Sequence, residues 1–148
     1  MPRQNTKCRI NPMLDLKTNS CPFCAVNDSG ITSRVLIEDE LSFCIYDGYP
    51  VSEGHCLIIP NRHISSFFEA SREEKMSLFN ILDLAKEHID KKFSPQGFNI
   101  GINDGPAAGQ TVPHLHIHLI PRYQDDAEDP RGGIRLIFPG KANYWDKK

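Results

Sequence analysis

The clearest pattern in this chain is a strict alternation of histidine and aliphatic residues near its C-terminal third. The alternating residues are His114, Leu115, His116, Ile117, His118 and Leu119. Because successive side chains of a β-strand leave on opposite faces, this pattern predicts a half-buried strand with all three histidines on one face. The aliphatic residues would then face a core, and the imidazoles would form a row that can meet one extended polar ligand.

Four more short apolar runs have the length of strands and are bounded by turn-forming residues. They are residues 34–37, 41–46, 55–60 and 98–102. An acidic turn at residues 38–40 separates the first two runs and predicts a hairpin. Strands outnumber helices and no strand–helix–strand unit repeats, so the pattern favours an α+β fold over a doubly wound α/β fold.

One long helix is predicted after Ser71, which forms a capping box with Glu74. Apolar residues then recur near helical spacing and predict one buried face. These residues are Met76, Phe79, Leu82, Ile89 and Phe93. The breaker-rich stretch 94–97 ends the helix.

Composition narrows the class of protein. The 148 residues suit one domain, and a net charge of −2 argues against bulk binding of nucleic acid. No apolar run reaches the roughly 18 residues of a membrane span, and residues 1–20 form a polar arm without the apolar centre of a signal peptide. Five cysteines, an odd number, favour reduced thiols or a metal over a disulfide framework. We therefore expect a cytoplasmic protein.

The histidine row favours phosphate chemistry. A neutral imidazole is a competent nucleophile toward phosphorus, and flanking imidazoles can polarise phosphate oxygens or donate a proton. The preceding loop carries Gly105, Gly109, Gln110 and Thr111, and glycine lets backbone amides approach a phosphate. Two alternatives remain: a metal site built on His-x-His, which would make a metal-dependent enzyme, and solvent-facing histidines without function.

A second motif, Cys21-Pro22-Phe23-Cys24, carries two cysteines at a spacing used in several kinds of site. Zinc binding, redox chemistry and ordinary thiols all remain open from this spacing alone. Zinc would need two further ligands from elsewhere in the chain.

The histidine motif resembles that of the histidine-triad (HIT) family, in which three histidines alternate with apolar residues. Residues 103–112 and 54–64 are also similar to blocks of that family. The resemblance implies a HIT-like α+β fold with an antiparallel sheet of about five strands and two main helices. It also implies a homodimer with a continuous sheet. The chain would divide into an arm at 1–20, a HIT domain at 21–122 and a C-terminal tail at 123–148 that packs on the domain.

The same resemblance implies a nucleotide hydrolase that acts at the α-phosphate. His116 would be the nucleophile and form a nucleotidyl-histidine intermediate, and His118 would flank the phosphate. Further contacts are implied for Asp47 with the ribose, and for the phosphate with Asn103, Gly109, Gln110 and Thr111. The transferase branch of the family has glutamine at the third histidine, so His118 is similar to the hydrolase branches and favours water as the acceptor.

The substrate would be a dinucleoside polyphosphate or a nucleoside phosphoramidate, and magnesium could accompany a polyphosphate. No organic cofactor is expected. The alternative to an enzyme is a nucleotide-binding regulatory or scaffold protein with incidental catalysis.

For the cysteine pair, the resemblance implies a zinc site. Some HIT proteins hold zinc with such a pair and two histidines, which correspond here to His63 and His114. The zinc would be structural because four protein ligands leave no open coordination position. In that case His114 is not available as an acid or a base.

Overall fold

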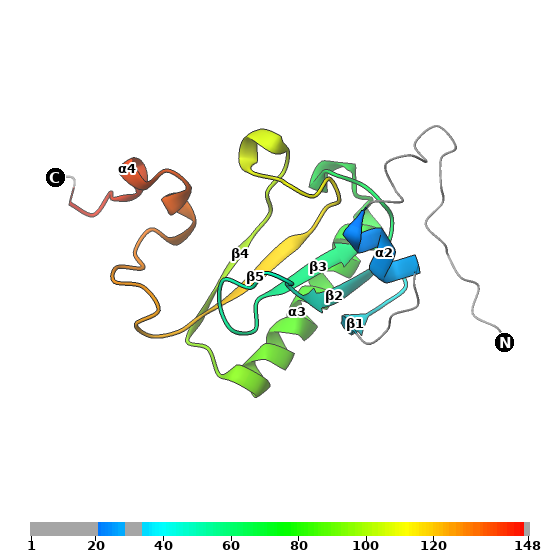
Figure 1. Ribbon diagram of the computed structural model, residues 1–148, viewed down its shortest axis with the longest axis horizontal. Coiled ribbons are helices and arrows are strands. Elements are labelled where there is room, and N and C mark those ends of the chain that lie inside the picture. The colour runs from blue at the N-terminus through cyan, green and yellow to red at the C-terminus, as the bar shows by residue number, and fades with distance from the viewer. Residues whose placement is uncertain (1–20, 29–33, 147–148) are drawn as a thin grey trace.

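The computed structural model of this protein describes residues 21–28 and 34–146 (Figure 1). The polar arm predicted at residues 1–20 lies outside the described residues. Within them, no helix is both long enough and apolar enough to cross a membrane.

Five antiparallel strands form a single sheet in the order β1-β2-β3-β5-β4. The strands are β1 (Val35–Glu38), β2 (Ser42–Tyr46), β3 (Cys56–Pro60), β4 (Gly97–Gly101) and β5 (Ile117–Arg122). Each overlaps one of the five apolar runs of the sequence. The strand pairing confirms the predicted α+β class, the hairpin of the first two strands and the antiparallel sheet.

Helix α3 (Arg72–Phe93) covers one face of this sheet and contacts strands β1, β2, β3 and β5 (Figure 1). The predicted capping box is confirmed, because the Ser71 hydroxyl accepts from the Glu74 amide and the Glu74 carboxylate accepts from the Ser71 amide. The helix is 22 residues long. It is the only long helix in the described part of the chain, where the resemblance implied two main helices.

The buried face of α3 is predicted only in part: Ile89 is buried, and Leu82 and Phe93 pack against the core. Met76 and Phe79 are about half exposed. The residues that face the sheet are Glu74, Ser77, Leu78, Ile81, Ala85 and Ile89. Two residues of this face are polar, so apolar spacing does not reveal them, and both have partners. Arg62 donates two 2.8 Å hydrogen bonds to Glu74, and the Ser77 hydroxyl donates to Asp39 at 2.7 Å.

The other helices are short. Helix α2 (Pro22–Asp28) has seven residues and α4 (Pro139–Ala142) has four. Three 3-10 turns complete the described chain: η2 (Phe67–Glu69), η3 (Pro106–Ala108) and η4 (Gly133–Ile137).

Hydrophobic side chains are buried on both faces of the sheet. The larger core joins α3 to Cys44, Cys56, Ile58, Leu115, Ile117 and Leu119. The smaller core joins α2 to Phe43, Ile45, Leu57 and Ile59. Central strand β3 is buried along its whole length because both of its faces are covered.

The histidine stretch keeps its predicted alternation but is not a strand throughout. Leu115, Ile117 and Leu119 all enter the core beneath α3, which directs the intervening histidines to the opposite face. Strand β5 begins only at Ile117, because neither neighbouring strand pairs with the residues before it. There the Leu115 amide instead donates to the Ile64 carbonyl oxygen at 2.6 Å.

The C-terminal segment beyond β5 forms a small lobe outside β4 (Figure 1). Arg131 lies over the ring of Trp145 at 4.4 Å, and the Arg135 guanidinium donates to the Ala142 carbonyl oxygen at 3.1 Å. Element η4 contacts β4, with Ile134 next to Gly101. The rest of the lobe extends away from the sheet, and the predicted division at residue 123 stays a prediction.

Candidate active site

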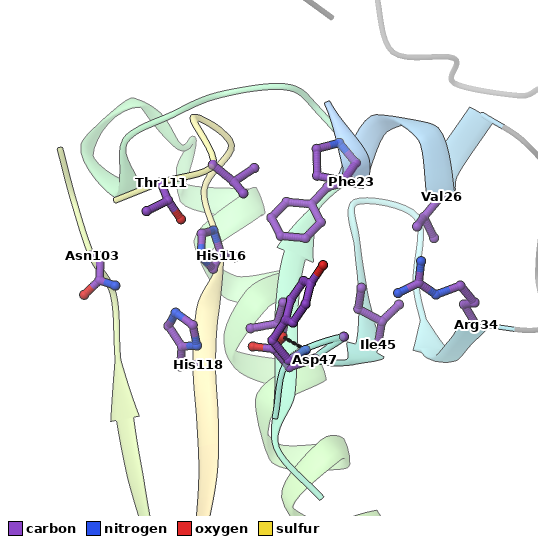
Figure 2. A pocket seen from close by; sticks show the side chains of 14 residues that line it. Phe23, Val26, Arg34, Ile45, Asp47, Asn103, Thr111, His116 and His118 are labelled. Atoms are coloured by element: carbon purple, nitrogen blue, oxygen red, sulfur yellow. Dashed lines mark hydrogen bonds between the residues drawn. The ribbon is translucent and has the colours of Figure 1, made fainter. Parts of the chain in front are cut away.

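A cavity of about 580 Å³ opens on the face of the sheet opposite α3 (Figure 2). Its lining residues are Pro22, Phe23, Val26, Arg34, Ile45, Asp47, Gly48, Tyr49, Leu57, Asn103, Thr111, Val112, His116 and His118. The structure thus brings together five of the site residues expected from the sequence, namely His116, His118, Asp47, Asn103 and Thr111.

The cavity has a polar end and an apolar end. In Figure 2, Asn103 and Thr111 lie beside the two histidines, whereas Val26, Arg34 and Ile45 lie on the far side of Asp47. Apart from Arg34 the far end is apolar, so a ligand with a hydrogen-bonding group, a polar middle and a flat apolar end matches the cavity from one end to the other.

His116 lies at the polar end and is held by the backbone. Its Nδ1 is 2.8 Å from the carbonyl oxygen of His114. A carbonyl only accepts, so Nδ1 carries the proton and Nε2 of the neutral ring keeps its lone pair. Phe23 packs edge-on against the same ring, with the centroids 5.1 Å apart. The ring is thereby fixed with an unprotonated nitrogen available for nucleophilic attack.

His118 lies next to His116, with ring centroids 5.0 Å apart. Burial, followed by the nearby His116 and His55, lowers the pKa of His118 to about 4. The imidazole of His118 is therefore neutral at pH 7.

His55 lies behind His118, is 3% exposed and does not line the cavity. Its Nε2 is 3.0 Å from Nδ1 of His118 and 3.4 Å from a carboxylate oxygen of Asp47. Burial lowers the pKa of His55, and the Asp47 carboxylate opposes this shift. The three side chains make one polar cluster at the base of the cavity.

Two residues of the glycine-rich loop are not brought to the cavity. Gln110 uses its side chain within the protein, accepting from the Gly105 amide at 2.8 Å and donating to the carbonyl oxygens of Ser65 and Val112. The amides of Gly109 and Gln110 donate to Pro106 and Gly105 inside the loop. Gly109 and Gln110 therefore shape the loop, whereas Thr111 reaches the cavity.

Cys21, Cys24, His63 and His114 form a second cluster, and their ligand atoms all lie within 4.8 Å of one another. Nδ1 of His114 is 3.5 Å from Sγ of Cys21 and 3.6 Å from Sγ of Cys24. Nδ1 of His63 is 3.2 Å from Sγ of Cys24. Tetrahedral zinc with its usual bond lengths separates sulfur and nitrogen ligands by about 3.6 Å, so the spacing fits that ion.

The tautomer of His114 also suits a metal. Its Nε2 donates to the carbonyl oxygen of Pro60 at 2.9 Å, which leaves the lone pair of Nδ1 directed toward the cysteines. Burial lowers the pKa of His114 to about 4 and also lowers that of His63. Both rings are therefore neutral at pH 7, as metal ligands must be.

The apolar wall of the cavity and His55 were not predicted as site residues. Phe23 lies between the two cysteines and Val26 follows them on α2, so the cysteine motif also supplies part of the cavity wall. Recognising this from the sequence would have required knowing that α2 folds over the sheet. His55 gave a partial signal, since a histidine at the start of an apolar strand needs a polar partner.

This α+β fold places two adjacent histidines in a cavity large enough to hold a nucleotide, as in a nucleotide-binding protein. Residues 28–125 match the model of the HIT domain, about two-thirds of the chain, so the protein belongs to the HIT family.

Three relatives illustrate the match. A zinc-bound histidine-triad family protein from Mycobacterium smegmatis superposes with a TM-score of 0.68 at 32% identity, covering 76% of this chain and 81% of that one. The asymmetrical bis(5'-nucleosyl)-tetraphosphatase of Schizosaccharomyces pombe is 38% identical over 65% of this chain and 53% of its own length. An adenylylsulfatase of Arabidopsis thaliana is 36% identical over 73% of this chain and 55% of its own length. The chain thus spans just over half of each of these two enzymes.

Proposed function

We propose that this protein is a nucleotide hydrolase that acts at the α-phosphate through a nucleotidyl-histidine on His116. The observation that carries the proposal is the pairing of His116 Nδ1 with the His114 carbonyl oxygen, which leaves Nε2 as a nucleophile in the cavity. The similarity to a tetraphosphatase and an adenylylsulfatase supports hydrolysis of a nucleotide anhydride.

In the first step, Nε2 of His116 donates its lone pair to the α-phosphorus. The bond from phosphorus to the leaving group breaks, and its electron pair departs with that group, which takes up a proton from solvent when it is an amine. Asn103 and Thr111 lie where their side chains can donate hydrogen bonds to the phosphoryl oxygens. In the second step a water oxygen attacks the phosphorus, the bond to His116 breaks, and the electron pair returns to Nε2 while the water loses a proton to solvent.

Asp47 is proposed to bind the ribose hydroxyls, because it lies between the polar and apolar ends of the cavity. The base would then rest among Val26, Ile45 and Leu57, which supply flat apolar walls. Both a dinucleoside polyphosphate and a nucleoside phosphoramidate fit this arrangement, since only the first nucleotide needs the cavity.

A structural zinc ion is proposed to bind Cys21, Cys24, His63 and His114. Bound there, zinc would supply no chemistry to the reaction and would fix α2 to the residues before β5. The zinc-bound relative from M. smegmatis supports the presence of zinc in this family.

The proposed activity is tested by incubating the full chain with diadenosine tetraphosphate, with and without magnesium, and separately with an adenosine phosphoramidate. We expect AMP from at least one substrate, together with ATP if the tetraphosphate is cleaved. Nucleotide binding detected by calorimetry without any turnover would instead identify a nucleotide-binding regulatory protein.

We also propose a homodimer that continues the sheet through edge strand β4. Ile100 on this strand is 49% exposed, next to exposed apolar residues of η4. Replacing Ile100 with lysine is expected to convert a dimer into a monomer in sedimentation experiments. Leu84 on α3 is equally exposed at 48%, so Leu84→Lys is the matched control and should leave the dimer intact. A wild-type chain that sediments as a monomer would contradict the proposal.

The cytoplasm is the proposed compartment. Among the described cysteines, Cys21, Cys44 and Cys56 are not in disulfides, which suits a reducing environment.

A further inference from the structure

We infer that His55 is a positioning residue that fixes the protonation of His118, so that His118 presents an Nε2–H hydrogen-bond donor to the substrate phosphate. This inference deepens the proposed function, on which its role for the substrate rests. It depends on a chain of hydrogen bonds that runs from a backbone amide through two imidazoles to the cavity.

The chain begins at Val51, in the loop between β2 and β3. Its backbone N–H donates to Nδ1 of His55 at 3.2 Å. A backbone amide cannot accept a hydrogen bond, so Nδ1 of His55 must be the unprotonated nitrogen. The proton of the neutral His55 ring therefore lies on Nε2.

The second hydrogen bond, from His55 to His118, determines which nitrogen of His118 is unprotonated. Nε2–H of His55 points at Nδ1 of His118, 3.0 Å away, and that nitrogen must accept. The single proton of neutral His118 is consequently on Nε2, on the other side of the ring. Because His118 lines the cavity, this Nε2–H is the donor available to a phosphoryl oxygen.

Asp47 strengthens the same arrangement. Its carboxylate oxygen is 3.4 Å from Nε2 of His55 and favours a proton on that nitrogen. Its other carboxylate oxygen accepts from the Tyr49 amide at 2.8 Å, which holds the carboxylate in the loop. The opposite tautomer of His55 would turn an Nδ1–H toward the Val51 N–H and lose both contacts.

The cluster of Asp47, His55 and His118 also has the composition of a metal site, since its ligand atoms lie within 4.8 Å of one another. The Val51 amide argues against this alternative. A neutral histidine bound to metal through one nitrogen has its proton on the other, where it donates to an acceptor. Nδ1 of His55 faces a donor, so binding metal at Nε2 would require a doubly deprotonated ring. The His114 ring, whose Nε2–H faces a carbonyl, is the contrasting case.

The backbone thus sets the two catalytic histidines in opposite tautomers. His116 carries its proton on Nδ1 and offers a lone pair, whereas His118 carries its proton on Nε2 and offers a donor. His118 keeps this proton throughout both steps, because a neutral imidazole that lost it would become a strongly basic anion. Its contribution is stabilisation of charge on the phosphate oxygens.

The tautomers can be measured without substrate. Two-bond ¹H–¹⁵N correlation spectra of the ¹⁵N-labelled full chain distinguish protonated from unprotonated ring nitrogens. We expect His55 and His118 each to show a protonated Nε2 and an unprotonated Nδ1 at pH 7. A protonated Nδ1 on either ring would overturn the inference, even if the protein proves to be a hydrolase.

Variants of His55 test the effect on catalysis. His55→Phe removes the donor and is expected to lower kcat by about 100-fold, a loss typical of one misplaced charge-stabilising donor, with little change in KM. His55→Gln retains an N–H donor and is expected to recover most of that loss. His88→Gln changes a histidine of α3 outside the cavity and should stay within about twofold of wild type.

The outcomes separate the inference from the proposed function. Absence of turnover in wild type would contradict the hydrolase and leave the spectra to decide the tautomers. Equal kcat in wild type and a folded His55→Phe variant would overturn the positioning role. A second equivalent of zinc that binds wild type and is lost in His55→Phe would also overturn it, in favour of a metal site.

Discussion

Replacing His116 with alanine is expected to lower nucleotide hydrolysis by about 10⁴-fold or more while the protein stays folded, because the substitution removes the nucleophile itself. The asparagine, threonine and His118 donors would remain, so nucleotide binding should persist. Turnover of the adenosine phosphoramidate gives the rate, and calorimetry with AMP gives the affinity. A covalent intermediate provides a second readout. Wild type quenched during turnover under alkaline conditions should carry one nucleotidyl group by mass spectrometry, and His116→Ala should carry none.

His88→Ala is the control for loss of a histidine ring elsewhere, since His88 lies on α3 and contacts the Tyr46 hydroxyl at 3.1 Å. It should keep activity within about twofold of wild type. Retained turnover in His116→Ala would refute the proposed mechanism. A covalent nucleotide on a different residue would do the same.

Loss of one ligand of the proposed zinc site should have the largest effect on stability. Cys24→Ser is expected to abolish stoichiometric zinc in protein purified without chelator and to lower the free energy of unfolding by about 3 kcal/mol, or Tm by roughly 10 °C. The Sγ of Cys24 lies near both histidines of the cluster, 3.2 Å from Nδ1 of His63 and 3.6 Å from Nδ1 of His114. Elemental analysis and thermal unfolding measure the two effects.

Activity should fall as well, because His114 connects the two sites. Its ring faces the cysteines, and its carbonyl oxygen holds Nδ1 of His116. Cys44→Ala is the matched control, a buried core cysteine outside the cluster whose loss should cost about 1 kcal/mol and leave zinc bound. Wild type without zinc, or Cys24→Ser with a full equivalent, would contradict the proposed site.

Local patterns in the sequence predicted most of the sheet and the face on which the histidines lie. Alternation placed Leu115, Ile117 and Leu119 in the core correctly because a strand has only two faces. The capping box predicted the first residue of α3 correctly, because its hydrogen bonds are made within one turn. Both patterns depend on neighbours close in sequence.

What the sequence did not predict depends on contacts between distant residues. Glu74 and Ser77 are buried because Arg62 and Asp39 bind them, so apolar spacing alone gave the buried face of α3 only in part. Gln110 was expected at the phosphate, but Gly105, Ser65 and Val112 occupy its amide. Likewise, the hydrogen bonds of His55 with Val51 and His118 form only when the strands pair and bring these residues together.

Helix α2 contributes Phe23 and Val26 to the cavity but lies outside the sheet, against one of its faces. His116 and His118 lie next to and on β5, which is between β3 and edge strand β4, so these histidines and this part of the cavity wall are encoded in separate stretches of chain. Substitution of Val26 can therefore alter the cavity wall without changing Cys24, or Phe23, which packs against His116. Related proteins with this fold can therefore diverge in substrate preference through a few substitutions in the cavity wall.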